Sequence, residues 1–328
     1  MSTTLLQDDI GSMLSSVFED AEAPIYVVNP SQETISSLMT TLDRQDAGAE
    51  VRLLADERTL KDVMDDFLVA STAADLVEAG TLSMRLLETV PNHSVAVTAD
   101  GVYALVTIGD VVGGLGTDDD AFVDDAEAYY ESTWESAEEY SLRTPAISRV
   151  RSTLESEIGD ETAEDFDSVL GSLATARGDG DGLDEVTISL LVAARNNELL
   201  YDISKWGEDV GLASKATFSR VKTRLEDSGL VETEKVPIDV GRPRLRLRLD
   251  DDDLKAADLP TLTDDVTALS FLPLAHVFER VSGHFLQFGF GESSRIHQNT
   301  VNLKAFLFGQ VFDAIGGVEA PAEGQYYF

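Results

Sequence analysis

The sequence predicts an α/β N-terminal domain, an acidic helical connector, a winged helix-turn-helix domain of the α+β class and a C-terminal tail of uncertain structure. Two observations predict this order. Short apolar strands alternate with amphipathic helices over residues 24–110, which is typical of an α/β sheet. Three helical segments followed by two strands occupy residues 184–249. We therefore expect domains at 1–120, 121–178 and 180–250, and the tail at 251–328.

Local signals mark the elements of the predicted α/β domain. A capping box formed by Asn29 and Gln32, with a proline directly after Asn29, indicates a helix start. Asp56 is placed to cap the next helix, and Asp100-Gly101 is a two-residue hairpin signal between two strands. We expect strands at 25–28, 51–54, 82–87, 95–98 and 102–106, and helices at 30–45 and 56–78. The glycine- and aspartate-rich residues 111–120 are expected to form a loop.

Four polar residues follow the first two predicted strands. In open α/β sheets, ligands bind beyond the carboxyl ends of the strands, where helix N-termini present free N–H groups. The sequence thus predicts a site for a small anionic or sugar-like metabolite, an effector, at Asn29, Ser31, Asp56 and Glu57. The alternative is that Asn29 and Asp56 only cap their helices.

The second domain carries the signals of a helix-turn-helix. Helices are expected at 184–198, 199–210 and 215–228, and strands at 230–235 and 244–249. Gly211-Leu212-Ala213 is the predicted turn, Ser214 the predicted N-cap of the third helix and Gly229 its stop. The first helix is expected to be amphipathic, with one apolar side.

The third helix separates into two faces. Phe218, Val221 and Leu225 recur at helical spacing and form an apolar stripe. Arg220 lies on the opposite face among small and hydroxyl-bearing residues, a composition suited to reading base edges in the major groove, with Arg220 facing guanine. Ala216 on that face suits contact with a thymine methyl group.

The last predicted strand alternates arginine with leucine, so its arginines share one face. A row of arginines in such an acidic chain favours an anionic partner, and arginine at a wing tip commonly enters a minor groove. The predicted contacts to double-stranded DNA are Ser214, Lys215, Thr217, Ser219, Arg220, Thr223, Arg224, Arg242, Arg244 and Arg246.

Charge is distributed unevenly along the chain. The net charge is −37, from 61 acidic and 24 basic side chains. Only residues 203–249 are basic, with 10 Lys and Arg against 7 Asp and Glu, and this contrast is expected where a polyanion docks. Acids spread over the rest of the chain and a scarcity of lysine indicate a halophilic protein, because salt near ~1 M screens self-repulsion beyond about 3 Å.

A single winged helix reads a short site, and two-fold related copies double it, so we expect a homodimer. The candidate interface is the aromatic side of the predicted helix at 121–140, which carries Phe122, Tyr129, Tyr130, Trp134 and Tyr140.

Several classes of function lack their signals. The chain has no cysteine, no phosphate-binding loop and no apolar run long enough for a membrane helix, so we expect no cofactor, no metal site and a cytoplasmic location. His93 is followed by Ser94 and Val95, whereas phospholipase-D-like catalysis needs a lysine two residues after its histidine. Two alternatives to a non-enzymatic regulator remain: a winged helix that binds proteins, and an α/β enzyme with an appended DNA-binding domain.

The order of these elements resembles the haloarchaeal TbsP family of transcriptional regulators over about residues 1–260. The resemblance rests on Ile25-Tyr26-Val27-Val28-Asn29-Pro30-Ser31, Val51-Arg52-Leu53-Leu54-Ala55-Asp56-Glu57 and Gly241-Arg242-Pro243-Arg244. It implies a regulator of central carbon metabolism that responds to sugars, without catalytic residues. Residues 261–328 depart from that pattern and are rich in phenylalanine and histidine, which suits either an added domain or a non-native extension.

Overall fold

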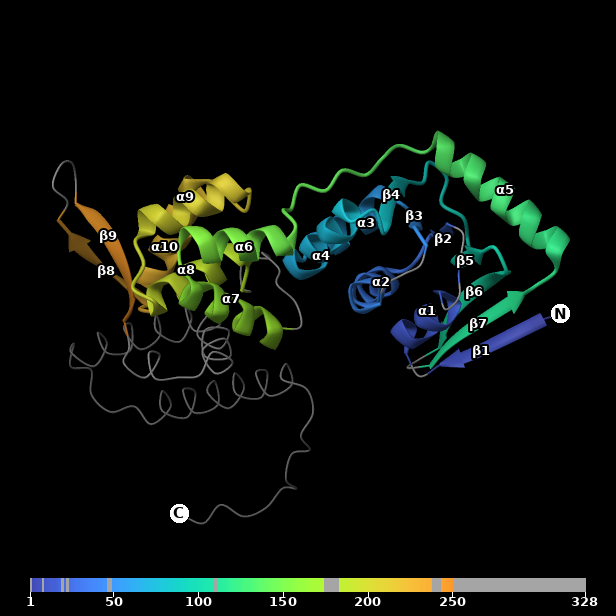
Figure 1. Ribbon diagram of the computed structural model, residues 1–328, viewed down its shortest axis with the longest axis horizontal. Helices are drawn as coiled ribbons and strands as arrows, with labels where there is room; N and C mark the ends of the chain where they lie inside the picture. Colours follow the sequence, from blue (N-terminus) through green and yellow to red (C-terminus); the bar gives the residue numbers. More distant parts are fainter. Residues whose placement is uncertain are drawn as a thin grey trace, which may run out of the picture. The chain divides into compact units, whose positions relative to one another are not determined.

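The computed structural model describes residues 2–7, 9–18, 21, 24–45, 49–108, 111–173, 183–237 and 243–250 (Figure 1). An α/β domain with one sheet is followed by a helical region and a helix-turn-helix, which confirms the predicted fold class. The predicted tail at 251–328 and the predicted contact Arg242 lie outside the described residues. Within those ranges, no helix combines the length and the apolar character needed to cross a bilayer.

The α/β domain is built on a seven-stranded mixed sheet in the order β1-β7-β6-β5-β2-β3-β4. Only β2, β3 and β4 are parallel to one another, and the remaining neighbours are antiparallel. The strands are β1 (Ser2–Gln7), β2 (Ile25–Val28), β3 (Val51–Ala55), β4 (Leu82–Leu86), β5 (Val95–Thr98), β6 (Gly101–Ile108) and β7 (Val111–Thr117).

Both faces of the sheet are covered, so its central strands are apolar on both sides. Along β3, Leu53 packs into the core under one layer of helices, whereas Leu54 packs into the core on the opposite face. The first layer contains α1 (Ile10–Phe18), α2 (Gln32–Arg44), α3 (Glu57–Met64) and α4 (Phe67–Glu78). The other face is covered by α5 (Asp120–Ser136), through Tyr130 and Trp134 (Figure 1).

The prediction of a loop at 111–120 is wrong, because residues 111–117 form β7. Its glycines have low intrinsic strand propensity, but β7 is paired on both sides, with β6 and with β1. Gly116 lies opposite Tyr103 in register, and a Cβ on Gly116 would lie 2.6 Å from that ring. The tyrosine therefore covers the backbone where a side chain is missing, and sheet pairing overrides local propensity.

The predicted start of α2 is also wrong. Asn29 adopts a left-handed φ of 49°, and its amide donates to the Pro91 carbonyl at 2.8 Å instead of capping the helix. Ser31 is the N-cap, and its hydroxyl accepts from the Thr34 N–H at 3.2 Å. The helix predicted at 56–78 divides into α3 and α4 at Asp66, which caps α4 through the Leu68 N–H.

The segment expected to be one connector divides between two cores. Its first helix, α5, packs on the α/β sheet, whereas the next two pack with the helix-turn-helix. The second core contains α6 (Ile147–Glu157), α7 (Asp160–Ser172), α8 (Glu185–Arg195), α9 (Leu200–Val210), α10 (Lys215–Asp227), β8 (Val231–Val236) and β9 (Arg244–Leu249). Residues 186–194 of α8 are all buried, so this helix is central to the core and not amphipathic as predicted.

A capping contact joins the α/β domain to α6. The N-cap position of α6 is Ala146, which has no capping side chain. Asp75 of α4 supplies the missing acceptor: its carboxylate accepts from the Ser148 N–H at 3.0 Å and from the Ser148 hydroxyl. A carboxylate is favourable at this end of a helix, because the unsatisfied N–H groups carry partial positive charge.

Helices α9 and α10 are in close contact where Gly207 meets Phe218. A Cβ on Gly207 would lie 2.3 Å from Cζ of the fully buried Phe218 ring. Gly211 ends α9 with a left-handed φ of 95°, which allows the chain to turn into α10. The bare backbone at Gly207 thus sets how closely the two helices pack.

We predict that Gly207→Ala lowers the free energy of unfolding by about 1–3 kcal/mol, because the added methyl group overpacks against Phe218. Gly171→Ala in α7 is the matched control, since no described atom lies within 4 Å of a Cβ there. Because alanine has a higher helix propensity than glycine, this control should leave the free energy of unfolding unchanged or raise it by up to about 1 kcal/mol. Denaturant unfolding followed by circular dichroism checks both, and equal stabilities would contradict the proposed close contact.

Candidate nucleic-acid interface

Helix α10 forms as the sequence predicts, and its ends are fixed by local hydrogen bonds. The Ser214 hydroxyl accepts from the Thr217 N–H at 3.2 Å, and Gly229 follows the helix with a φ of 72°. The predicted apolar stripe of Phe218, Val221 and Leu225 is buried. Ser214 and Thr217 therefore have capping roles at the N-terminal end of α10.

The opposite face of α10 is exposed. Ala216, Ser219, Arg220 and Thr223 all lie there and line a shallow groove along the helix. The Thr223 hydroxyl donates to the Ser219 carbonyl at 3.0 Å, which keeps its side chain close to the helix. Within the described part of the chain, Arg220 makes no ion pair or hydrogen bond. Its guanidinium therefore remains available for a ligand in front of α10.

Strands β8 and β9 pair as an antiparallel hairpin directly after α10. A third segment extends this sheet, because the Leu247 N–H donates to the Glu198 carbonyl at 2.8 Å in the turn before α9. Leu247 and Leu249 are buried and Leu245 is partly buried, so the predicted leucine face is confirmed. The arginines of β9 occupy the other face.

The arginines of β9 meet acids of the same domain, so the row by itself is no evidence for an external anion. Arg244 pairs with Asp202 at 3.1 Å and lies 4.4 Å from the ring centroid of Tyr201. Arg248 pairs with Glu234 at 3.1 Å. Arg246, at the centre of the row, lies near Glu198. Burial raises the pKa of Glu198, and the positive charge of Arg246 opposes that rise.

The predicted cations of α10 are partly engaged as well. Lys215 pairs with Glu208 at 2.7 Å, and this hydrogen bond lowers the pKa of Glu208 and raises that of Lys215. Arg224 donates to the Thr187 hydroxyl at 3.2 Å, toward α8. Sequence reasoning missed these partners, because Glu208 and Thr187 lie on other helices and no periodic spacing links them to α10.

A hollow of about 420 Å³ lies between α9, the start of α10 and the start of β9. It is lined by Tyr201, Lys215, Ser219 and Arg244 together with apolar neighbours. Ser219 also lines the groove along α10, so the two surfaces are continuous. A nucleic-acid backbone in the hollow would place its phosphates near Lys215 and Arg244, with bases in front of Arg220.

Comparison with known families decides the identity of this arrangement. Residues 2–145 match the model described as the N-terminal part of TbsP-like transcriptional regulators, and residues 146–267 match the C-terminal helix-turn-helix domain of the same regulators. The chain belongs to the family of TbsP-like transcriptional regulators. It is thus a DNA-binding protein of the helix-turn-helix class, and both matched models describe parts of regulators, not enzymes.

Solved structures similar to this TbsP-like regulator match only part of it. TrmBL2, an archaeal chromatin protein, is 16% identical with a TM-score of 0.33, over 42% of this chain and 54% of TrmBL2. The phospholipase D family member Nuc of Salmonella typhimurium is 11% identical, with a TM-score of 0.31 over 43% of this chain and 99% of Nuc. NucT of Helicobacter pylori is 17% identical, with a TM-score of 0.31 over 43% of this chain and 100% of NucT. Likenesses at these TM-scores establish nothing about function, and no curated protein matches the sequence.

The predicted effector residues of the TbsP-like N-terminal domain lie together at the carboxyl ends of β2 and β3. Each side chain has a partner within the domain. Asn29 and Ser31 make the contacts given above, Asp56 accepts from the Thr59 N–H at 3.0 Å, and Glu57 pairs with Lys61 at 2.5 Å. Among the described residues, no group of three or more histidines or acids is arranged to hold a metal ion.

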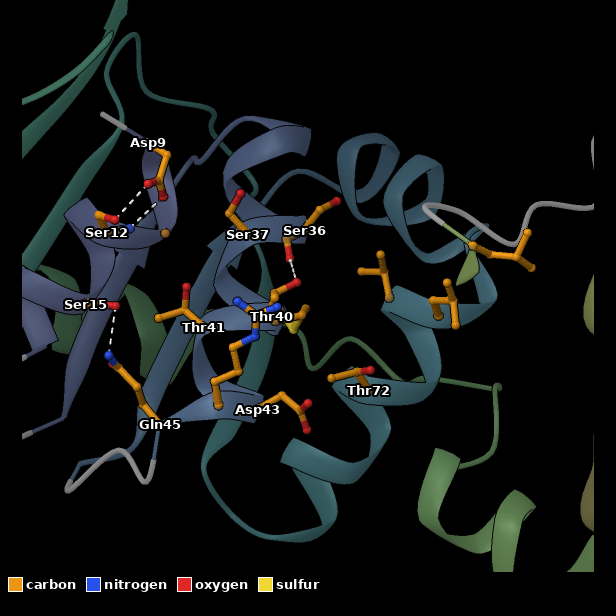
Figure 2. A pocket seen from close by; sticks show the side chains of 16 residues that line it. Asp9, Ser12, Ser15, Ser36, Ser37, Thr40, Thr41, Asp43, Gln45 and Thr72 are labelled. Carbon is orange, nitrogen blue, oxygen red and sulfur yellow. Dashed lines mark hydrogen bonds between the residues drawn. The ribbon is translucent and has the colours of Figure 1, made fainter. Parts of the chain in front are cut away.

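A larger groove, of about 800 Å³, lies on the helical layer of the same domain, and Leu173 after α7 also lines it (Figure 2). Hydroxyl groups from α1, α2 and α4 line it, and many are already engaged. Figure 2 shows Ser12 bonded to Asp9, Thr40 to Ser36, and the Gln45 amide to Ser15. These side chains bond one another or their own helix, and we assign no ligand to this groove.

The role of Asp56 in this TbsP-like regulator can be tested by pH. The hydrogen bond to Thr59 lowers the pKa of Asp56 below its ordinary value of 3.8. A lowered carboxylate pKa stabilises the fold fully above pH 3.8, and this stabilisation is lost as pH falls through the folded-state pKa. We expect Asp56→Ala to lower the free energy of unfolding by about 1 kcal/mol near neutral pH. The difference from wild type should shrink as the pH falls below 3.8. Urea unfolding across pH measures it; a constant difference would contradict a charge-dependent cap.

Proposed function

We propose that this TbsP-like regulator binds double-stranded DNA sequence-specifically, with α10 in the major groove and the β8–β9 hairpin as a wing beside it. The observation that carries the proposal is the exposed face of α10, where Arg220 has no intramolecular partner among the described residues while Phe218, Val221 and Leu225 anchor the opposite face in the core. A helix held this way presents one base-reading side chain to a groove.

The roles of the contacts follow from their chemistry. Arg220 reads guanine through a bidentate hydrogen bond, and Ala216 contacts a thymine methyl group. Ser219 and Thr223 bond bases or phosphates, while Lys215 and Arg244 hold the backbone at the hollow. Binding of some genomic fragments and not others, measured by mobility shift at high salt, tests the proposal. Uniform binding, or none, would reject it.

The finer identity rests on charge and on the family resemblance. A net charge of −37 supports a halophilic cell, where screening removes much of the self-repulsion. The resemblance supports a role in central carbon metabolism. The metabolite effector stays a prediction, because its four residues lie together but each is engaged in structural contacts.

We predict that Arg220→Ala reduces discrimination between operator and scrambled DNA by about 1–3 kcal/mol, because a base contact is lost. Arg244→Ala should weaken both duplexes about equally, and more at low salt, because the Asp202 charge that Arg244 neutralises would be left facing the DNA backbone. Fluorescence anisotropy over a KCl series measures both variants. If Arg220→Ala weakens operator and scrambled DNA by the same factor at every salt concentration, α10 is not the reading helix.

We also propose that the regulator acts as a homodimer through α5. The aromatic side chains of α5 are divided: Tyr130 and Trp134 pack on the sheet, whereas Phe122 and Tyr129 are 54% and 66% exposed and lie two turns apart on one face. This exposed pair is the refined candidate interface. A large aromatic surface without a covering element is costly in water.

Changing Phe122 and Tyr129 together to serine should convert a dimer to a monomer without unfolding the domain, because neither ring is in the core. Multi-angle light scattering in concentrated KCl measures the mass. The control is Val77→Ser, since Val77 is an exposed apolar residue on α4 and is expected to leave the mass unchanged. A wild-type monomer at micromolar concentration would contradict the proposal.

A further inference from the structure

The cations proposed to face DNA differ in whether an acid of the same domain pairs with them. Lys215 and Arg244, at the hollow between α9, α10 and β9, are held by Glu208 and Asp202. Both acids belong to α9, one near each end of the helix. Arg220, further along α10, makes no such pair among the described residues. The two cations at the hollow are thus neutralised by acids, whereas Arg220 is not.

We propose that Asp202 and Glu208 are built-in competitors for phosphate, which keep the affinity for non-specific DNA low and leave recognition to base contacts. This inference rests on the DNA-binding function proposed above and concerns the regulation of that same surface.

The physical reason is the exchange of one anion for another. A phosphate that reaches Arg244 must displace the Asp202 carboxylate or share the guanidinium with it, so little net attraction is gained. The displaced carboxylate also stays close to the DNA, where it repels the backbone. The same exchange applies to Lys215 and Glu208, where the ammonium and the backbone N–H of Lys215 both bond the carboxylate.

The exposure of these pairs makes the exchange feasible. The side chains of Lys215, Glu208, Arg244 and Asp202 are between 37% and 45% exposed, so no core packing opposes their separation. Exposed ion pairs are weak and sensitive to salt. Tyr201 keeps the Arg244 guanidinium over its ring, so this cation stays in place when its acid leaves.

A consequence concerns the salt dependence of binding. Each phosphate neutralised by an unpaired cation contributes about one unit to the slope of log affinity against log salt. A cation that exchanges one carboxylate for a phosphate contributes much less. The wild-type chain should therefore have a shallower slope than its number of DNA-facing cations suggests, which suits binding in concentrated salt.

The test uses the full chain and a pool of random-sequence duplexes of ~30 bp, because the claim concerns non-specific affinity. Asp202→Asn and Glu208→Gln keep the shape of each side chain and remove its charge. We expect each variant to raise the affinity about threefold to tenfold and to steepen the salt slope by about one unit, with the two effects combining in the double variant. Anisotropy in KCl from about 0.5 M to about 2 M measures this, and thermal unfolding confirms that the variants are folded.

Asp167→Asn is the matched control. Asp167 on α7 pairs with Arg151 on α6, and its side chain is similarly exposed. Its substitution gives the same change in net charge, but Asp167 lies outside the hollow. It should change the affinity by less than about twofold, since a distant exposed charge is screened at these salt concentrations.

The outcomes separate this inference from the proposed function. If wild-type protein binds selected fragments but the two acid variants gain no more than Asp167→Asn, only the competitor role is overturned. Weaker binding by the variants would also overturn it and would assign the acids to base contacts. If neither wild type nor variants bind any duplex, both proposals fail. Binding of random duplexes by the variants alone would support the competitor role.

Discussion

The contact between α9 and α10 is the constraint on which the proposed DNA-binding surface depends. Gly207 has no side chain, so the Phe218 ring packs directly on the α9 backbone. Phe218 anchors the core side of α10 and fixes the direction in which Arg220 points. The same contact sets Glu208 beside Lys215 and the N-terminal turn of α9 beside β9. A rotation of α10 about this contact would change the exposed face proposed to read DNA, and both ion pairs, together.

The acidic composition of the chain opposes its binding to DNA, which is also negatively charged. The chain has a net charge of −37 but binds a polyanion, and its 24 basic residues serve different purposes. Some are structural: Arg52 and Arg85 lie at 5.6 Å and 4.8 Å from the Trp134 ring and bind α5 to the sheet. Others, Lys215 and Arg244, line the hollow beside α10 with an acid next to each. Arg220 differs from both groups, and this difference is what makes it the best candidate for base recognition.

Much of the helix-turn-helix could be predicted from local pattern. The Ser214 cap, the Gly211 turn and the Gly229 stop depend on contacts within a few residues, and the apolar stripe at Phe218 follows from helical periodicity. The structure confirms each of them. The alternation of leucine and arginine in β9 was equally reliable, because period two is a property of the strand itself. The partners of those arginines were not predictable, since Asp202 and Arg244 are 42 residues apart.

By itself, the sequence determined the order of the domains, the ends of α10 and the two faces of that helix, since periodicity and capping are local. Tertiary structure decided that the glycine-rich segment at 111–117 is a strand, because β6 and β1 supply backbone partners from distant parts of the chain. It also decided that Ser31, not Asn29, caps α2, and that α5 belongs to the sheet while α6 and α7 belong to the helix-turn-helix. Finally, it decided which cations are neutralised, because the energy of an ion pair depends on distance in space and not on separation along the chain.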